Sequence, residues 1–211
     1  MGLMNSWIAV QGVAKADLFA EMGWEETGQE VDPFSGIAAF SYLEKPGGWL
    51  VIFSDDFDWA SQEEILAFSQ FGLTLGCQFE DKVEMTSIVT AARDGVELWQ
   101  VSHINDPIFR LDVRGEPPAE LAAIHEQALR DQHAAGGRDA GVDLIFEVPL
   151  DLAKAICGYR ADEEESMFIA LDGADPYFED DDEDEFDDDP GQDRERGPGL
   201  LQRFAAFFRH R

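Results

Sequence analysis

The chain has 211 residues, with 15 Lys or Arg against 45 Asp or Glu, and a formal net charge of −30. Its apolar share of 45% is typical of a globular domain and argues against a wholly disordered chain. A charge this negative repels phosphate and so argues against nucleic-acid binding. The apolar runs are all far shorter than the roughly 20 residues of a membrane span.

The first part of the chain predicts strands and helices in alternation. The predicted order is a strand, a helix, two strands, a helix and a strand, at residues 6–10, 14–22, 37–43, 49–53, 61–71 and 73–79. Pro46-Gly47-Gly48 indicates a turn between the paired strands. Ser61 and Glu64 have the spacing of a capping box, in which each side chain accepts from the other residue's backbone N–H.

The second part predicts a hairpin, a strand and a helix–strand–helix ending. The elements lie at residues 83–92, 96–103, 108–113, 117–133, 142–148 and 150–156. Asp94-Gly95 is a strong signal for a two-residue hairpin turn. If Arg93 faces Val96 across that turn, the register places Thr86 opposite His103.

These elements predict an α+β fold with a mainly antiparallel sheet. The first six match a ferredoxin-like βαββαβ unit, and the hairpin and the αβα segment follow. Residues 161–190 hold sixteen Asp or Glu and no Lys or Arg, a composition typical of a self-repelling linker. We therefore predict a single domain over residues 1–171, a disordered acidic linker over 172–198, and a short amphipathic C-terminal helix over 199–211.

The predicted C-terminal helix carries one apolar stripe, formed by residues spaced i, i+1, i+4, i+7 and i+8. These residues are Leu200, Leu201, Phe204, Phe207 and Phe208. Arg203 lies off the stripe. A peptide this short is marginal as an isolated helix, so it needs a surface to fold against. The acidic body of the same chain, a groove on a partner and an anionic membrane are the candidates, with the membrane the least favoured because the linker is acidic.

Five short motifs within residues 5–160 carry a resemblance to known sequences. They are Ser6-Trp7-Ile8-Ala9-Val10, Gly48-Trp49-Leu50-Val51, Ser54-Asp55-Asp56-Phe57, Trp99-Gln100-Val101-Ser102-His103 and Val142-Asp143-Leu144-Ile145-Phe146-Glu147-Val148-Pro149. On these residues the chain resembles a family of bacterial proteins of unknown function. The resemblance implies one domain, and it implies no activity, cofactor or partner.

Two groups of residues are weak candidates for chemistry. In the predicted register Glu84 lies diagonal to His103 on one face, so a carboxylate could orient an imidazole as in a general-base pair. Asp55, Asp56 and Asp58 follow a predicted strand, and with His103 they could hold a divalent metal. The alternative is that His103 is a strand-end residue satisfied by a neighbour and that the aspartates form a helix-capping turn.

The preferred functional prediction is a non-enzymatic acidic protein-binding module for a basic protein, such as an inhibitor or an immunity-type protein. A metal-assisted hydrolase and a tethering protein that docks its C-terminal helix in a partner's groove are the alternatives. We expect no cofactor, no nucleic-acid ligand and a cytoplasmic location. The two cysteines, Cys77 and Cys157, lack metal-ligand spacing and do not suggest a disulfide framework.

Overall fold

The computed structural model describes residues 4–81, 85–104 and 110–173. They form one nine-stranded sheet, four α-helices and two 3₁₀ turns. The elements are β1 (Met4–Gln11), α1 (Lys15–Met22), β2 (Trp24–Val31), η1 (Pro33–Ser35), β3 (Phe40–Lys45), β4 (Trp49–Ser54), α2 (Gln62–Phe68), β5 (Leu73–Glu80), β6 (Thr86–Arg93), β7 (Val96–His103), β8 (Leu111–Gly115), α3 (Glu120–Ala134), η2 (Gly137–Asp139), α4 (Glu147–Cys157) and β9 (Phe168–Gly173).

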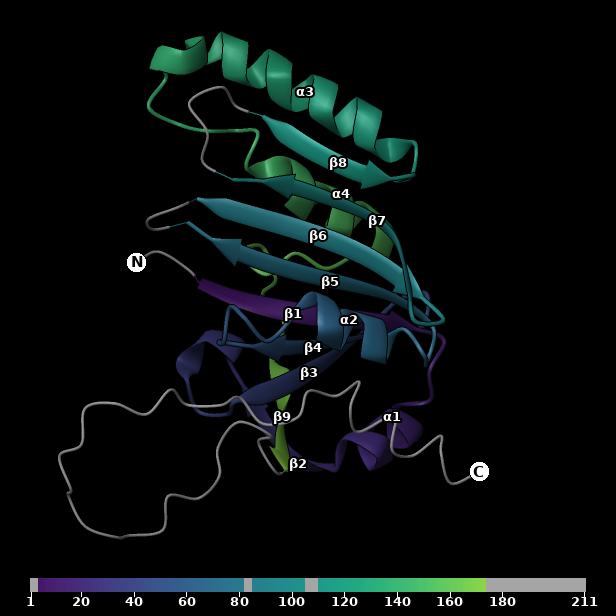
Figure 1. Ribbon diagram of the computed structural model, residues 1–211. Coiled ribbons are helices and arrows are strands. Elements are labelled where there is room, and N and C mark those ends of the chain that lie inside the picture. Colours follow the sequence, from purple (N-terminus) through teal and green to yellow (C-terminus); the bar gives the residue numbers. More distant parts are fainter. Residues whose placement is uncertain (1–3, 82–84, 105–109, 174–211) are drawn as a thin grey trace, which may run out of the picture.

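The sheet has the strand order β2-β9-β3-β4-β1-β5-β6-β7-β8 (Figure 1). Every neighbouring pair of strands is antiparallel. An α+β fold with an antiparallel sheet is therefore confirmed. The ferredoxin-like assignment of the first elements stays a prediction. The structure adds the strand β2 after α1 and extends the sheet to nine strands.

Helices cover the sheet on both faces. In Figure 1, α2 lies in front of the sheet and α4 behind it, while α3 lies beyond edge strand β8. One core contains Leu18 of α1 and Phe68 of α2, and the other contains Leu152 of α4. The central strand β4 is buried at every position, which explains its unbroken apolar sequence.

Local chemistry fixes two of the connections. The Ser61 side chain accepts from the Glu64 N–H at 3.2 Å, so this half of the predicted capping box is confirmed, while the Ser61 N–H donates to the Trp59 carbonyl oxygen at 2.7 Å. A Cβ atom on Gly76 of β5 would lie 2.2 Å from Ile65 Cδ1, so the glycine lets α2 approach the sheet closely. Asp94 and Gly95 both have positive φ, as a two-residue hairpin turn requires.

The predicted hairpin register is wrong beyond the turn. Arg93 faces Val96 as expected, but the register shifts between Ala91 and Ala92. A bulge adds one unpaired residue to β7 and moves every later pair by one. His103 therefore faces Ser87, and not Thr86.

Three other expectations differ from the structure. Residues 142–148 do not form a strand: they lead into α4, which begins at Glu147, and Ile145 and Val148 are buried against the sheet. A short apolar run of this kind has the same pattern in a buried strand and in a buried helix. Strands β2 and β9 were not predicted, because β2 is exposed between Trp24 and Val31 and β9 lies within the acid-rich region.

The predicted C-terminal helix and most of the predicted linker lie outside the described residues, and so does Glu84. Strand β9 continues to Gly173. Among the helices of the described segments, none is both long enough and apolar enough to span a membrane.

Trp99 offers a direct test of how the sheet is packed. Its side chain is 7% exposed within the α4-facing core, whereas its neighbour Leu98 is 43% exposed. Trp99→Ala should therefore lower the free energy of unfolding by about 3–5 kcal/mol, because it removes a large buried ring. Leu98→Ala is the control and should change it by less than about 1 kcal/mol. Equal effects in urea denaturation would contradict this packing.

Candidate functional site

The aspartates after β4 form a turn. The backbone carbonyl of Asp56 accepts from Ser6 Oγ at 2.6 Å, and Asp56 Oδ1 accepts from the Asp58 N–H at 2.9 Å. Asp55, Asp56 and Asp58 are exposed. This Asx-type geometry is typical of a turn that connects a strand to the next helix, and it accounts for the aspartate spacing without a ligand.

His103 lies at the end of β7 and is fully buried. Its Nδ1 lies 2.9 Å from the Arg110 carbonyl oxygen, and its Nε2 lies 2.8 Å from Asp143 Oδ2. A carbonyl oxygen only accepts, so Nδ1 carries a proton, and the second bond needs another proton on Nε2 or on the Asp143 carboxyl. Both ring nitrogens are occupied, so this histidine joins three segments and leaves no nitrogen for an external substrate.

The two groups of candidate residues are not brought together. Strands β4 and β7 are four inter-strand spacings apart, about 19 Å across the sheet. Within residues 4–81, 85–104 and 110–173, no three His, Cys, Asp or Glu residues gather as a metal-binding group. The described geometry therefore gives the hydrolase interpretation no support.

Asp143 was not predicted as the partner of His103. It lies forty residues away in a run expected to be a strand, and nothing in the local pattern marks it. Asp143 also accepts from the Ile145 N–H at 3.0 Å through Oδ1, which fixes the turn before α4. The pair thus connects β7 to the start of α4.

Removal of the Asp143 carboxylate should destabilise the fold. Asp143→Ala leaves a buried imidazole nitrogen without its partner, and we expect a loss of about 1–3 kcal/mol in the free energy of unfolding. The control is Asp112→Ala, because Asp112 forms an exposed ion pair with Arg110 and should contribute less than about 1 kcal/mol. Similar losses for the two variants in thermal denaturation would contradict the structural role of the His103–Asp143 pair.

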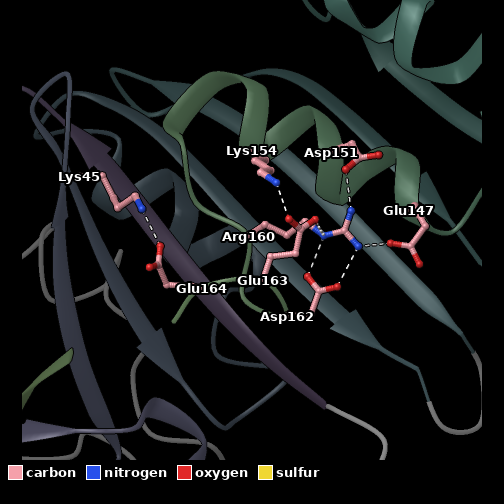
Figure 2. A network of polar contacts seen from close by, with 8 residues as sticks. All are labelled: Lys45, Glu147, Asp151, Lys154, Arg160, Asp162, Glu163 and Glu164. Carbon is pink, nitrogen blue, oxygen red and sulfur yellow. Dashed lines mark hydrogen bonds and ion pairs between the residues drawn. The ribbon is translucent and has the colours of Figure 1, made fainter. Parts of the chain in front are cut away.

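Arg160 is the centre of an ionic network on α4 (Figure 2). Its guanidinium contacts Glu147 and Asp151 of α4, and also Asp162 and Glu163 in the following loop. The side chain is 9% exposed, while the four carboxylates are between 33% and 47% exposed. Lys154 adds a second cation by pairing with Glu163. Four carboxylates therefore face two cations, and the cluster keeps an excess of negative charge.

Burial and neighbouring charges shift the pKa values of both Arg160 and Glu147 in this network. Burial alone lowers the pKa of Arg160, but the hydrogen bond to Asp162 and the nearby carboxylates raise that pKa well above its ordinary value. Burial raises the pKa of Glu147, although the Arg160 charge opposes the shift. Arg160 therefore stays charged and holds the loop after α4 against the helix.

A second ion pair fastens the same loop to β3. Lys45 Nζ lies 2.6 Å from Glu164 Oε2, with side chains 19% and 12% exposed. Burial alone raises the pKa of Glu164, but the hydrogen bonds from Lys45 and Ser166 outweigh it and hold the pKa below the ordinary 4.5. The pair therefore stabilises the fold above that pH, and its contribution is lost as the pH falls through the lowered pKa.

Lys45→Met should accordingly cost about 1–2 kcal/mol in the free energy of unfolding at pH 7. The difference from the unmodified chain should shrink as the pH falls below 4.5, because Glu164 then takes up its proton in both proteins. Lys154→Met is the control: its partner Glu163 and Lys154 itself are 47% and 46% exposed, so its effect should be small. Urea denaturation from pH 3 to 7 gives the comparison, and a Lys45→Met difference that grows toward low pH would contradict it.

Two adjoining hollows lie along α3 and α4, and we call them together the α3–α4 cleft. The first, of about 710 Å³, lies between the helices and is lined by Ala123, Ile124, Gln127, Ala128, Asp131, Leu144, Glu147, Asp151, Lys154 and Ala155. The second, of about 800 Å³, extends to the sheet and is lined by Leu73, Leu75, Ala91, Arg93, Leu98, Trp99, Gly115, Glu116, Pro118, Glu120, Ala155 and Ile156. Ala155 lines both hollows.

The cleft exists because α3 packs weakly. Gln132 is the only residue of α3 that is buried, and its side chain bonds Gly137, Val142 and Leu144 at the far end of the helix. Leu121 and Ile124 are only partly buried against the core. The apolar side chains of α3 and α4 that line the first hollow therefore remain open to solvent over the part of α3 that precedes Gln132.

The rim of the α3–α4 cleft is acidic. Five carboxylates line it, against the two cations Arg93 and Lys154: Glu116, Glu120, Asp131, Glu147 and Asp151. Glu147 and Asp151 belong to the Arg160 network, which fixes their positions on α4. An apolar floor with an anionic rim is suited to a ligand that is apolar on one side and cationic on the other.

The two cysteines do not add a reactive group. Cys77 and Cys157 are free and buried. Burial raises the pKa of the Cys157 thiol to about 11 and raises that of Cys77 further. Thiols in such surroundings are poor nucleophiles, since the thiolate is the reactive form.

Comparison of the chain with protein-family models, with curated proteins and with solved structures returns no match. Membership of the bacterial family that the sequence motifs suggest stays a prediction.

Proposed function

We propose that this chain is a non-enzymatic, acidic protein-binding module, and that the α3–α4 cleft receives a basic amphipathic segment of its protein partner. The observation that carries the proposal is the combination of an apolar floor and an acidic rim in one cleft. An amphipathic helix in a groove is a recurring mode of peptide recognition, and its apolar anchors repeat every three or four residues.

The size and lining of the cleft suit such a ligand. Each hollow falls within the range of about 300–1,000 Å³ that is usual for ligand sites. Apolar side chains such as Ile124, Leu144 and Ile156 supply the floor, and Trp99 lies at its sheet side. A bulky apolar side chain that enters from solvent would lose contact with water against these groups, which favours binding.

The negative charge of the chain adds selectivity for a cationic partner and speeds association with it. The formal net charge of −30 would attract a cationic protein over a long range and accelerate the encounter. The rim carboxylates would then pair with Lys or Arg at the edge of the bound segment. The partner class that this chemistry suits best is a basic toxin or nuclease, for which the chain would act as an inhibitor or immunity-type protein.

The proposal is tested with a synthetic peptide of fifteen residues that has Leu and Phe on one helical face and Arg on the other. Fluorescence anisotropy should show binding to the full chain that weakens as salt is raised. A charge-reversed peptide with Glu in place of Arg is the matched ligand and should not bind.

Ala155→Arg is the decisive variant, because it places bulk and positive charge where the two hollows meet. It should weaken peptide binding at least tenfold, about 1.4 kcal/mol. Ala122→Arg makes the same change on an exposed position of α3 that lines neither hollow, and its effect should stay within twofold. Equal binding by both variants, or equal binding of both peptides, would contradict the proposal.

A further inference from the structure

We infer that residues 199–211 of this same chain occupy the α3–α4 cleft in the free protein, where they compete with the partner. The inference deepens the proposed function and rests on it, because it assigns a regulatory ligand to the same cleft. It connects two features that lie far apart in the sequence: an open cleft in the described domain and a cationic amphipathic segment after the acidic run.

Charge complementarity favours this docking. Residues 199–211 contain Arg203, Arg209 and Arg211 and no Asp or Glu. The cleft and the Arg160 network share Glu147, Asp151 and Lys154; with each residue counted once, they hold seven carboxylates against three cations. Most of this chain is acidic, so residues 199–211 are an unusual stretch that the acidic rim would attract.

The apolar stripe of residues 199–211 also suits the cleft. Leu200, Leu201, Phe204, Phe207 and Phe208 fall on one side of a helix if these residues are helical. A helix this short is marginal by itself, so its formation needs an apolar surface. The α3–α4 cleft offers that surface through Ile124 and Ala128 in one hollow and Ile156 in the other.

The connecting residues are long enough to reach the cleft. The described chain ends at Gly173 of β9, and the strands β6, β7 and β8, whose residues line the second hollow, lie five to seven inter-strand spacings away, or about 24–34 Å across the sheet. The connection over residues 174–198 has twenty-five residues. An uncharged flexible chain of that length has an r.m.s. end-to-end distance of about 25–30 Å, repulsion between like charges makes such a chain more extended, and the limit when stretched is about 80 Å. Its length thus suits the span, and the effective concentration of the segment at the cleft is on the order of 1 mM.

Docking in cis would raise the threshold for partner binding. With an effective concentration of about 1 mM and a dissociation constant for the segment of about 100 µM, the partner's apparent affinity falls roughly tenfold. A partner whose segment matches the cleft better than residues 199–211 would displace them. The free chain would thereby keep its apolar cleft covered until such a partner arrives.

The position of residues 199–211 relative to the cleft is tested by disulfide trapping in the full chain. The variant Ala155→Cys/Phe204→Cys should form an intramolecular disulfide under a glutathione buffer at least ten times faster than Ala122→Cys/Phe204→Cys, as followed by mass spectrometry. The native Cys77 and Cys157 are buried and are the same in both variants. Equal trapping rates at positions 155 and 122 would overturn the inference.

Competition between residues 199–211 and a partner for the cleft is tested with the synthetic Arg-rich peptide. The full chain with Phe204→Ser/Phe207→Ser, which disrupts the stripe and leaves the charge unchanged, should bind that peptide roughly tenfold more tightly than the unmodified chain. The matched control Gln202→Ser/Ala206→Ser places the same two side chains on the opposite side of the predicted helix. It should change the affinity by less than twofold.

The outcomes separate the two proposals. Tighter binding by the stripe variant, with preferential trapping at position 155, supports both of them. Equal affinities for all three chains with undiminished sensitivity to Ala155→Arg would overturn docking in cis while leaving the cleft as the partner site. If the stripe variant binds neither the Arg-rich peptide nor its charge-reversed form, the proposed function is overturned. Preferential trapping at position 155 would then still support docking in cis, and equal trapping at positions 155 and 122 would overturn it.

Discussion

The limited packing of α3, which contacts mainly α4 and covers the core of the sheet only in part, is the constraint on which the cleft depends. The residues of α4 fill the core on one face of the sheet, so α4 is fixed in position. The only buried residue of α3, Gln132, fastens its last turns to the following loop. Apolar side chains of both helices line the hollows that remain, and a further apolar element can fill this cleft.

Electrostatics gives this cleft its character. Arg160 pairs with four carboxylates beside α4. Its single charge does not balance theirs, and the network stays anionic even when Lys154 is included. The same guanidinium positions Glu147 and Asp151 on the rim, so one residue contributes both to the fold and to the binding surface. By contrast, both ring nitrogens of the buried His103 have partners within the fold, and its bond to Asp143 connects β7 to the start of α4.

Local chemistry could be predicted from the sequence, whereas long-range contacts could not. The bond that caps α2 at Ser61 and the turn at Asp94-Gly95 depend on neighbouring residues, and both are present as predicted. The bulge near Ala91 depends on how two strands twist together, so the register beyond it was wrong. Strand β2 was missed because its acidic, exposed sequence lacks the alternation of a half-buried strand. The cleft itself arises from how two helices meet, which no local pattern encodes.

The most direct test of the account is an NMR titration of the full chain with the Arg-rich amphipathic peptide. The account predicts that the largest backbone amide shifts cluster on residues that line the α3–α4 cleft, such as Ala123, Ala128, Ala155 and Ile156. Shifts that cluster instead around α1 and α2 on the opposite face of the sheet, or that fail to saturate at any surface, would contradict it.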